Sequence, residues 1–144
     1  MFFARSFLVL VSLFVVACSS SAPAHETVKS LEGTSWGVVS IEGMAVVPGT
    51  MMTVQFGADG NMNGNTGCNQ FLATYAGESA MIRFELTGAS KKLCHEPNGV
   101  MDQESRFLAI LGVVASFESS GDQLVFVNPD GGAALTLQAS VDGQ

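Results

Sequence analysis

The stretch that decides the fold is MMTVQFGADGNMNGNTGCN, residues 51–69. Apolar side chains at positions 52, 54 and 56 alternate with other residues, which is typical of a strand with one buried face. Asp59-Gly60 follows, and Asp-Gly between two strands favours a tight hairpin turn. The next strand is expected over 61–69, where glycines at 64 and 67 indicate a bulge or the close approach of another backbone. The stretch therefore predicts an antiparallel strand pair.

The sequence on both sides continues the short alternating segments. Further strands are expected at 36–41, 71–76, 80–86, 123–127 and 134–138. Turn residues separate them, among them Gly77-Glu78 and the run from Asn128 to Gly132. This pattern predicts a sheet that is mostly antiparallel.

One segment changes period and predicts a helix from Val100 to near Gly112. Its apolar residues return at helical spacing, and Asp102, Gln103 and Arg106 are assigned to the opposite, polar side. Asn98, just ahead of the segment, is the expected cap. The helix is expected to pack its apolar side on the sheet.

The sum is an α+β fold: a mostly antiparallel, strongly curved, barrel-like β-sheet with one amphipathic helix packed on it. The length of 144 residues predicts a single domain. Seven aromatic residues fall at packing periods and are expected in the core: Trp36, Phe56, Phe71, Tyr75, Phe84, Phe107 and Phe126.

Charge bears on the class of partner. Six Lys and Arg residues stand against thirteen Asp and Glu residues, for a formal net charge of −7. An acidic chain has no basic patch with which to displace the counterions of a phosphate backbone. We therefore expect no nucleic-acid partner.

The amino terminus has the pattern of an export signal. Arg5 precedes an apolar run at residues 7–17, which is too short to cross a membrane and suits a signal peptide. The run ends in Val15-Val16-Ala17-Cys18, followed by Ser19, which resembles the lipobox of bacterial lipoproteins. That resemblance implies a signal peptide over 1–17 and lipidation of Cys18. It also implies a lipidated flexible tether over 18–30 and an outer membrane location facing the periplasm. An ordinary cleaved signal with an incidental Cys18 is the alternative.

Two cysteines, Cys68 and Cys94, are left after Cys18. In an oxidising compartment such a pair favours a structural disulfide. Free buried thiols are one alternative, and a reactive or metal-binding role beside His95 is another. The sequence has no C-x-x-C motif, which disfavours a redox-active role, and no fourth zinc ligand at usable spacing, which disfavours a zinc site.

Other patterns that could carry chemistry are weak. Residues 59–64 match the opening of a calcium-binding EF-hand loop, but Gln70 stands where the closing Glu should be. No G-x-S-x-G motif occurs, and His25 falls in the tether. We therefore expect no metal, no cofactor and no enzymatic activity, and interpret residues 58–61 as a hairpin turn.

The whole pattern resembles the META domain of HslJ-type heat-inducible lipoproteins over residues 31–139. The residues that carry the resemblance include the family-motif positions Gly67, Cys68, Asn69, Tyr75, Met101, Glu104 and Phe107. Ser90-Lys91 and Ala73 depart conservatively from the family pattern, and residues 140–144 form a C-terminal tail.

The resemblance implies a non-enzymatic envelope lipoprotein that supports stress response or antibiotic tolerance by binding another envelope component. The alternative is a chaperone similar to the pilots of secretins, which would hold a lipid or an amphipathic peptide in an apolar cavity. An enzyme that uses Cys94 and His95 is a third hypothesis. The expected partners are the membrane, through the lipid anchor, and an envelope protein or lipid.

Overall fold

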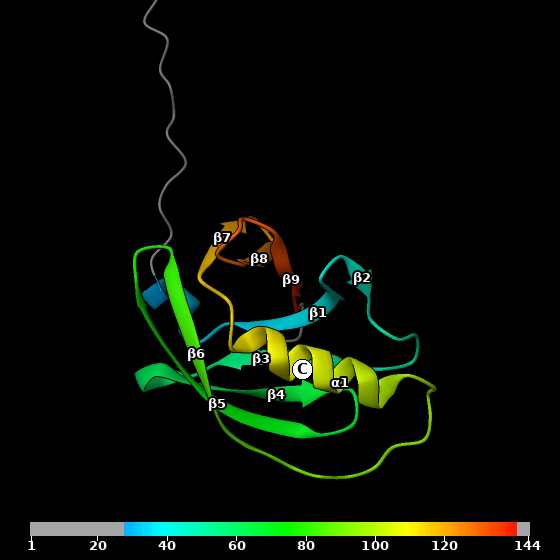
Figure 1. Ribbon diagram of the computed structural model, residues 1–144. Helices are drawn as coiled ribbons and strands as arrows, with labels where there is room; N and C mark the ends of the chain where they lie inside the picture. The colour runs from blue at the N-terminus through cyan, green and yellow to red at the C-terminus, as the bar shows by residue number, and fades with distance from the viewer. Residues whose placement is uncertain (1–27, 141–144) are drawn as a thin grey trace, which may run out of the picture.

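The computed structural model describes residues 28–140 (Figure 1). The predicted signal peptide, the predicted lipidation site Cys18, His25 and nearly all of the C-terminal tail lie outside the described residues. No helix within the described range is long and apolar enough to span a membrane.

Nine strands and one α-helix make up the fold of residues 28–140. The strands form one sheet of nine, and neighbouring strands run antiparallel. Their bounds are β1 (Ser35–Ile41), β2 (Met44–Ala45), β3 (Met52–Phe56), β4 (Asn61–Thr66), β5 (Gln70–Glu78), β6 (Met81–Ala89), β7 (Ser116–Ser120), β8 (Gln123–Val127) and β9 (Ala133–Ala139). The helix α1 spans Val100–Leu111, and two short 3₁₀ helices, η1 and η2, span Val28–Leu31 and Ala58–Gly60.

The hydrogen-bonding order of the sheet closes on itself. The order runs β2-β1-β3-β4-β5-β6-β7-β8-β9, and β9 pairs back with β1. The weakest junction of this ring is between β6 and β7, which share the single residue pair Met81 and Ser116. The prediction of a mostly antiparallel, curved sheet with one helix packed on it is confirmed (Figure 1).

Glycines explain how the strands bend so strongly. A Cβ atom at Gly64 would lie 1.9 Å from the carbonyl oxygen of Thr53, and one at Gly77 would lie 1.9 Å from the carbonyl oxygen of Met81. Neither position has room for a side chain, because the neighbouring strand comes too close. The close approach of another backbone, predicted from the glycine inside 61–69, is thus confirmed at Gly64.

The hairpin between β3 and β4 also follows the sequence. Asp59 and Gly60 both have positive φ, 59° and 72°, which is what the type I′ turn of an Asp-Gly hairpin requires. Strand β4 is shorter than expected, however, because the turn to β5 begins after Thr66. Strands β2 and β7 were not among the expected strands.

The helix confirms its predicted bounds but not its predicted cap. The cap position is occupied by Gly99, at φ 87°, and no side chain caps the helix. Asn98 was therefore the wrong choice, because the left-handed turn that leads into the helix falls on the following glycine. Gln103 was also misplaced: its side chain is fully buried and not on the polar side.

The folded domain begins earlier than the sequence indicated. Val28 and Leu31 on η1 are buried, and the Val28 amide donates a hydrogen bond of 3.0 Å to the carbonyl of Ser79. Residues 28–30 therefore belong to the domain and not to the predicted tether, because two apolar side chains three residues apart point into the core.

The core lies between the sheet and α1. Six of the seven expected aromatic residues are buried, and the seventh, Phe84, is half-buried and packs against the same cluster. Phe56 meets Tyr75 edge to face with ring centroids 5.1 Å apart, and Phe84 meets Phe126 at 5.0 Å. Such pairs add stability beyond the area that they bury.

Candidate functional site

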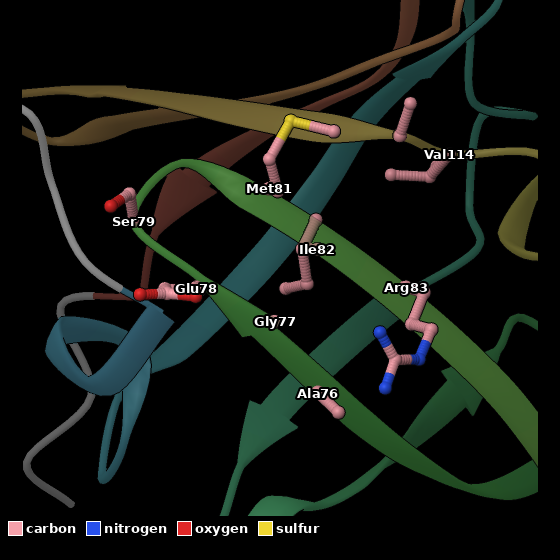
Figure 2. Close-up of a pocket in the computed structure, with 9 residues that line it drawn as sticks. Ala76, Gly77, Glu78, Ser79, Met81, Ile82, Arg83 and Val114 are labelled. Atoms are coloured by element: carbon pink, nitrogen blue, oxygen red, sulfur yellow. The ribbon is translucent and has the colours of Figure 1, made fainter.

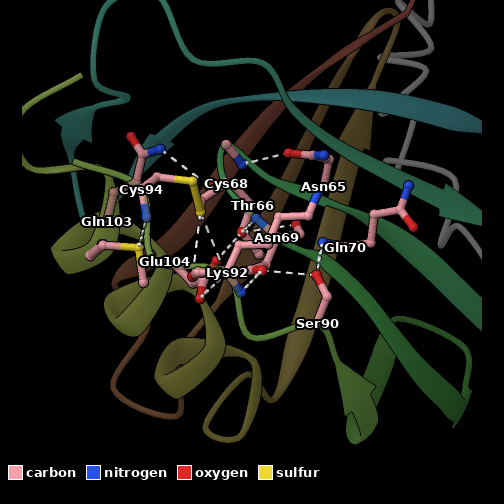
Figure 3. The surroundings of a disulfide bond; sticks show 12 residues. Asn65, Thr66, Cys68, Asn69, Gln70, Ser90, Lys92, Cys94, Gln103 and Glu104 are labelled. Atoms are coloured by element: carbon pink, nitrogen blue, oxygen red, sulfur yellow. Dashed lines mark hydrogen bonds between the residues drawn. A yellow bond between two sulfur atoms is a disulfide. The ribbon is translucent and has the colours of Figure 1, made fainter. Parts of the chain in front are cut away.

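Cys68 and Cys94 form a disulfide in the structure, with their Cα atoms 6.0 Å apart. Cys68 lies in the turn between β4 and β5, and Cys94 in the segment that leads to α1. The bridge therefore ties two loops that are separated by 26 residues in sequence. Figure 3 shows that the motif residues around it come from these loops and from the start of α1.

A buried polar cluster lies beside the disulfide and centres on Glu104 of α1. Its carboxylate accepts a hydrogen bond from the Thr66 hydroxyl and another, at 2.9 Å, from Nδ2 of Asn69. Both partners are almost completely buried. The helix is thus held to the end of β4 and to the following turn through one carboxylate.

Asn69 extends the cluster to the segment before α1. Its Nδ2 also donates to the carbonyl of Lys92 at 3.1 Å, and its Oδ1 accepts from the Lys92 amide at 2.7 Å. The same Oδ1 accepts from the Ser90 hydroxyl at 2.8 Å. The carboxamide therefore uses its donors and acceptors within the protein, and buried polar groups with this many partners make a rigid joint.

Gln103 was not among the predicted site residues, yet it completes the cluster. Its Oε1 accepts from the Val47 amide at 2.5 Å, and its Nε2 donates to Thr50 Oγ1 at 3.2 Å and to the Thr66 carbonyl at 3.3 Å. A signal for it existed, since position 103 is three residues after Val100 and four before Phe107, on the buried face of the helix. The polarity of the Gln103 side chain alone predicted the solvent-facing side of the helix, which is wrong.

The remaining motif residues divide between this cluster and the opposite part of the core. Gly67 has φ 100°, and a Cβ there would lie 2.9 Å from Gln103 Nε2. The Cys94 amide donates to Met101 Sδ at 3.5 Å, and the Phe107 ring lies 5.2 Å from that of Phe71. Gly67, Cys68, Asn69, Met101, Glu104 and Phe107 thus surround the joint between α1 and the sheet.

Tyr75 is the motif residue that lies elsewhere. Its hydroxyl donates to the Gly57 carbonyl at 3.0 Å, beside the β3–β4 hairpin. Burial raises the pKa of Tyr75, and the negative charge of Glu32 raises it further. The phenol is therefore held in its neutral form.

The polar groups of the cluster form hydrogen bonds with one another, and this arrangement indicates a structural role. Cys94 is bonded to Cys68, the oxygens of Glu104 face hydrogen-bond donors, and His95 is exposed. Within residues 28–140, no group of three or more His, Cys, Asp or Glu side chains could hold a metal ion. Asp59, the first position of the EF-hand resemblance, lies in the tight turn and has a positive φ of 59°.

A depression of about 840 Å³ opens at the β5–β6 hairpin and reaches Val114. Figure 2 shows its labelled side chains on the two arms of the hairpin, with Val114 across from them. Its charged residues, Glu78 and Arg83, are both exposed. The depression lies beside the β6–β7 junction, where only one residue pair joins neighbouring strands of the ring.

A second groove, of about 540 Å³, crosses the outer face of β3, β4, β5 and β6. Its walls combine uncharged polar side chains with the apolar Phe71, Leu72 and Ala89, and glycines of β4 and β6 contribute to its lining. It adjoins the polar cluster through Asn65, Gln70 and Ser90, which Figure 3 labels.

Comparison with known proteins identifies the class of domain. The family model of the META domain matches residues 29–141, and the chain therefore belongs to the META domain family. No curated protein matches the chain.

Three solved structures share the fold. An NMR structure of a protein from Burkholderia xenovorans is 22% identical, with a TM-score of 0.61, covering 96% of this chain and 97% of that one. A crystal structure of a DUF4847 family protein from Bacteroides vulgatus is 12% identical, with a TM-score of 0.59, covering 81% of this chain and 97% of that one. A further NMR structure, at 17% identity and a TM-score of 0.58, covers 76% and 92%. At these identities the likeness concerns the fold alone.

Proposed function

We propose that this META-domain chain is a non-enzymatic lipoprotein of the cell envelope, anchored through Cys18. In this proposal it supports stress response or antibiotic tolerance by binding another envelope component. The observation that carries the anchor is Val15-Val16-Ala17-Cys18 at the end of an apolar run, followed by serines. A second acyl chain makes such an anchor stable, since one chain gives marginal membrane binding. Ser19 directs the proposal toward the outer membrane.

The polar cluster supports a binding role over an enzymatic one. Catalysis by Cys94 would need a free thiolate oriented by a base, and Cys94 is bonded to Cys68. The carboxylate of Glu104 is occupied by Thr66 and Asn69, which position the helix. The disulfide also suits an oxidising compartment such as the periplasm.

Metabolic labelling tests the anchor directly. Cells grown with a clickable palmitate analogue should label the wild-type protein and not the Cys18→Ser variant, which should also leave the membrane fraction. Ser20→Ala is the matched control and should be labelled like wild type. A Ser19→Asp variant should move from the outer to the inner membrane. Equal labelling of Cys18→Ser and wild type would overturn the proposed anchor.

A second candidate function is that of the secretin-pilot-like chaperone. Two exposed apolar side chains favour it, Met51 and Leu93, which are 77% and 79% exposed. An amphipathic peptide labelled with a fluorophore should then bind the protein and lose affinity when both residues are changed to Ser. Unchanged affinity in that double variant, or no binding by wild type, removes this function.

A further inference from the structure

We infer that the groove on the outer face of β3–β6 binds an uncharged, N-acetylated glycan chain. The inference rests on the proposed function, because a location in the cell envelope would bring the groove into contact with the glycan of the cell wall. The volume of the groove, about 540 Å³, is within the range of small-molecule sites.

The groove lacks charged side chains. The chain carries a formal net charge of −7, yet none of the residues that line the groove is charged. A ligand with charged groups would find no counter-charge there, and burying its charge without a partner would cost free energy. The groove therefore favours a ligand that is polar and neutral.

The groove also offers side-chain amides that can form hydrogen bonds with a ligand. The side chains of Gln55, Asn63 and Gln70 form no hydrogen bond with other groups in the described part of the chain. Each carboxamide has two N–H donors and one carbonyl acceptor. An acetamido group on a sugar offers one N–H and one C=O, so a carboxamide can pair with both, and sugar hydroxyls can use the rest.

The register of the strands sets the spacing of the carboxamides in the groove. Gln55 lies directly across from Asn63, and Asn65 lies across from Gln70, in neighbouring strand pairs. Side chains opposite one another on antiparallel strands have Cβ atoms about 5 Å apart. The carboxamides thus form two pairs that lie two positions apart along β4 and together extend over three strands, although Asn65 Oδ1 already accepts from the Gly67 amide. A set of amides spread over this distance suits a chain of sugars better than a single ring.

One part of the groove lining is apolar and open. Leu72 is 60% exposed and lies across from Gly88, which has no side chain to cover it. The apolar C–H face of a sugar ring can pack on such a leucine while the hydroxyls at its edge reach the amides. A Cβ placed at Gly88 would meet nothing within 4 Å, so the space beside Leu72 is open.

Gly88 gives the sharpest test, because a Cβ added there meets no protein atom within 4 Å and a leucine would occupy the open space beside Leu72. Its φ lies outside the left-handed region, so Gly88→Leu should fold. The full-length protein is extracted in a detergent without a sugar headgroup and titrated with the trimer of N-acetylglucosamine in a calorimeter. We expect binding by wild type and none by Gly88→Leu, with equal melting temperatures.

Two further variants and a control define the surface. Asn63→Ala and Gln70→Ala should each weaken binding by about fivefold to tenfold, the effect of one lost hydrogen bond. Gln123→Ala, an exposed amide on β8 outside the groove, should bind like wild type. A trimer of galacturonic acid should bind more weakly than the N-acetylated trimer, and so should a trimer of glucose.

Three outcomes overturn the inference: no binding by wild type, binding unchanged in Gly88→Leu, or tighter binding of either competing trimer. None of them depends on Cys18, because binding is measured on purified protein. If the trimer does not bind but palmitate labels the wild-type protein, the glycan site is rejected and the lipid anchor is retained. If the trimer binds but labelling does not depend on Cys18, the glycan site is retained and the lipid anchor is rejected.

Discussion

The two ends of the domain are held together in different ways. At the start of α1, a disulfide and the side chains of Asn69, Gln103 and Glu104 join segments that are far apart in sequence. At the β5–β6 hairpin, one residue pair between β6 and β7 closes the ring. In Figure 1 the hairpin turn lies at the left and the start of α1 at the right. The first end is fixed by side-chain chemistry, and the second by a few backbone bonds.

The largest expected difference concerns two aromatic residues, Phe107 on α1 and Phe84 on β6, the strand that takes part in the β6–β7 junction. Phe107 is fully buried under the helix, and Phe84 on β6 is half-buried. Phe107→Ala should lower the free energy of unfolding by about 4 kcal/mol, because it removes a buried ring and leaves a cavity. Phe84→Ala should cost about half as much, since part of the ring already meets water. Urea denaturation measures both, and equal losses would contradict the distinction between the ends.

The disulfide should have the next largest effect. Cys68→Ala and Cys94→Ala should each lower stability by about 3.5 kcal/mol, the loop-closure value for a loop of this size. The double variant should lose no more than either single variant, because both remove the same cross-link. Thermal melts of the three variants and of reduced wild type provide the measurement. A role for a reactive Cys94 would instead show as lost function in Cys94→Ala with stability retained.

The cluster itself can be tested without changing its shape. Glu104→Gln replaces one carboxylate oxygen with an amide nitrogen, so that the Thr66 hydroxyl and Asn69 Nδ2 no longer both donate to a charged acceptor. Loss of the charge-assisted bonds should cost about 1 kcal/mol, the difference between hydrogen bonds to charged and to neutral groups. Glu78→Gln, at an exposed position of the hairpin, is the matched control and should change stability by less than about 0.5 kcal/mol. Similar losses in the two variants would show that the buried carboxylate does not act as the joint.

The smallest effect is a pH dependence at Tyr75. In the unfolded chain this phenol ionises near its ordinary pKa of 10.0, and in the folded protein its pKa is raised. The folded state keeps the proton longer, so its contribution is complete below about pH 10 and is lost as pH rises through the folded pKa. Wild type should therefore lose stability above pH 10 more steeply than Tyr75→Phe. Tyr75 is the single tyrosine, and phenolate absorbance reports its titration directly.

The sequence predicts contacts between neighbouring segments better than contacts between distant strands. Alternation at 52, 54 and 56 and the Asp59-Gly60 turn predict β3, β4 and their hairpin, because these features act between neighbours in the chain. The pairing of β9 with β1 is expected only as general curvature, since no local pattern specifies which distant strands meet.

The candidate site divides in the same way. The cysteine pair was predicted from the number and spacing of the cysteines, and the motif residues from the resemblance to the META domain, whereas Gln103 was assigned to the wrong face. A buried amide is stabilised by groups as distant as Val47, 56 positions away, and such partners exist only in the folded chain. The uncharged groove was missed for the same reason, because its lining residues are spread over four strands.

The place where the chain enters the fold has a mechanical consequence. Val28 is fixed to the β5–β6 turn by its bond to Ser79, and β1, which follows, pairs with β3 on one side and β9 on the other. A pull on the amino terminus would first load the Val28 contact at the weaker end of the domain. Beyond it, the load would reach a strand clamped along both edges, where several hydrogen bonds resist sliding at once. A protein tethered at that terminus could yield its first turn under tension while the rest of the sheet stays intact.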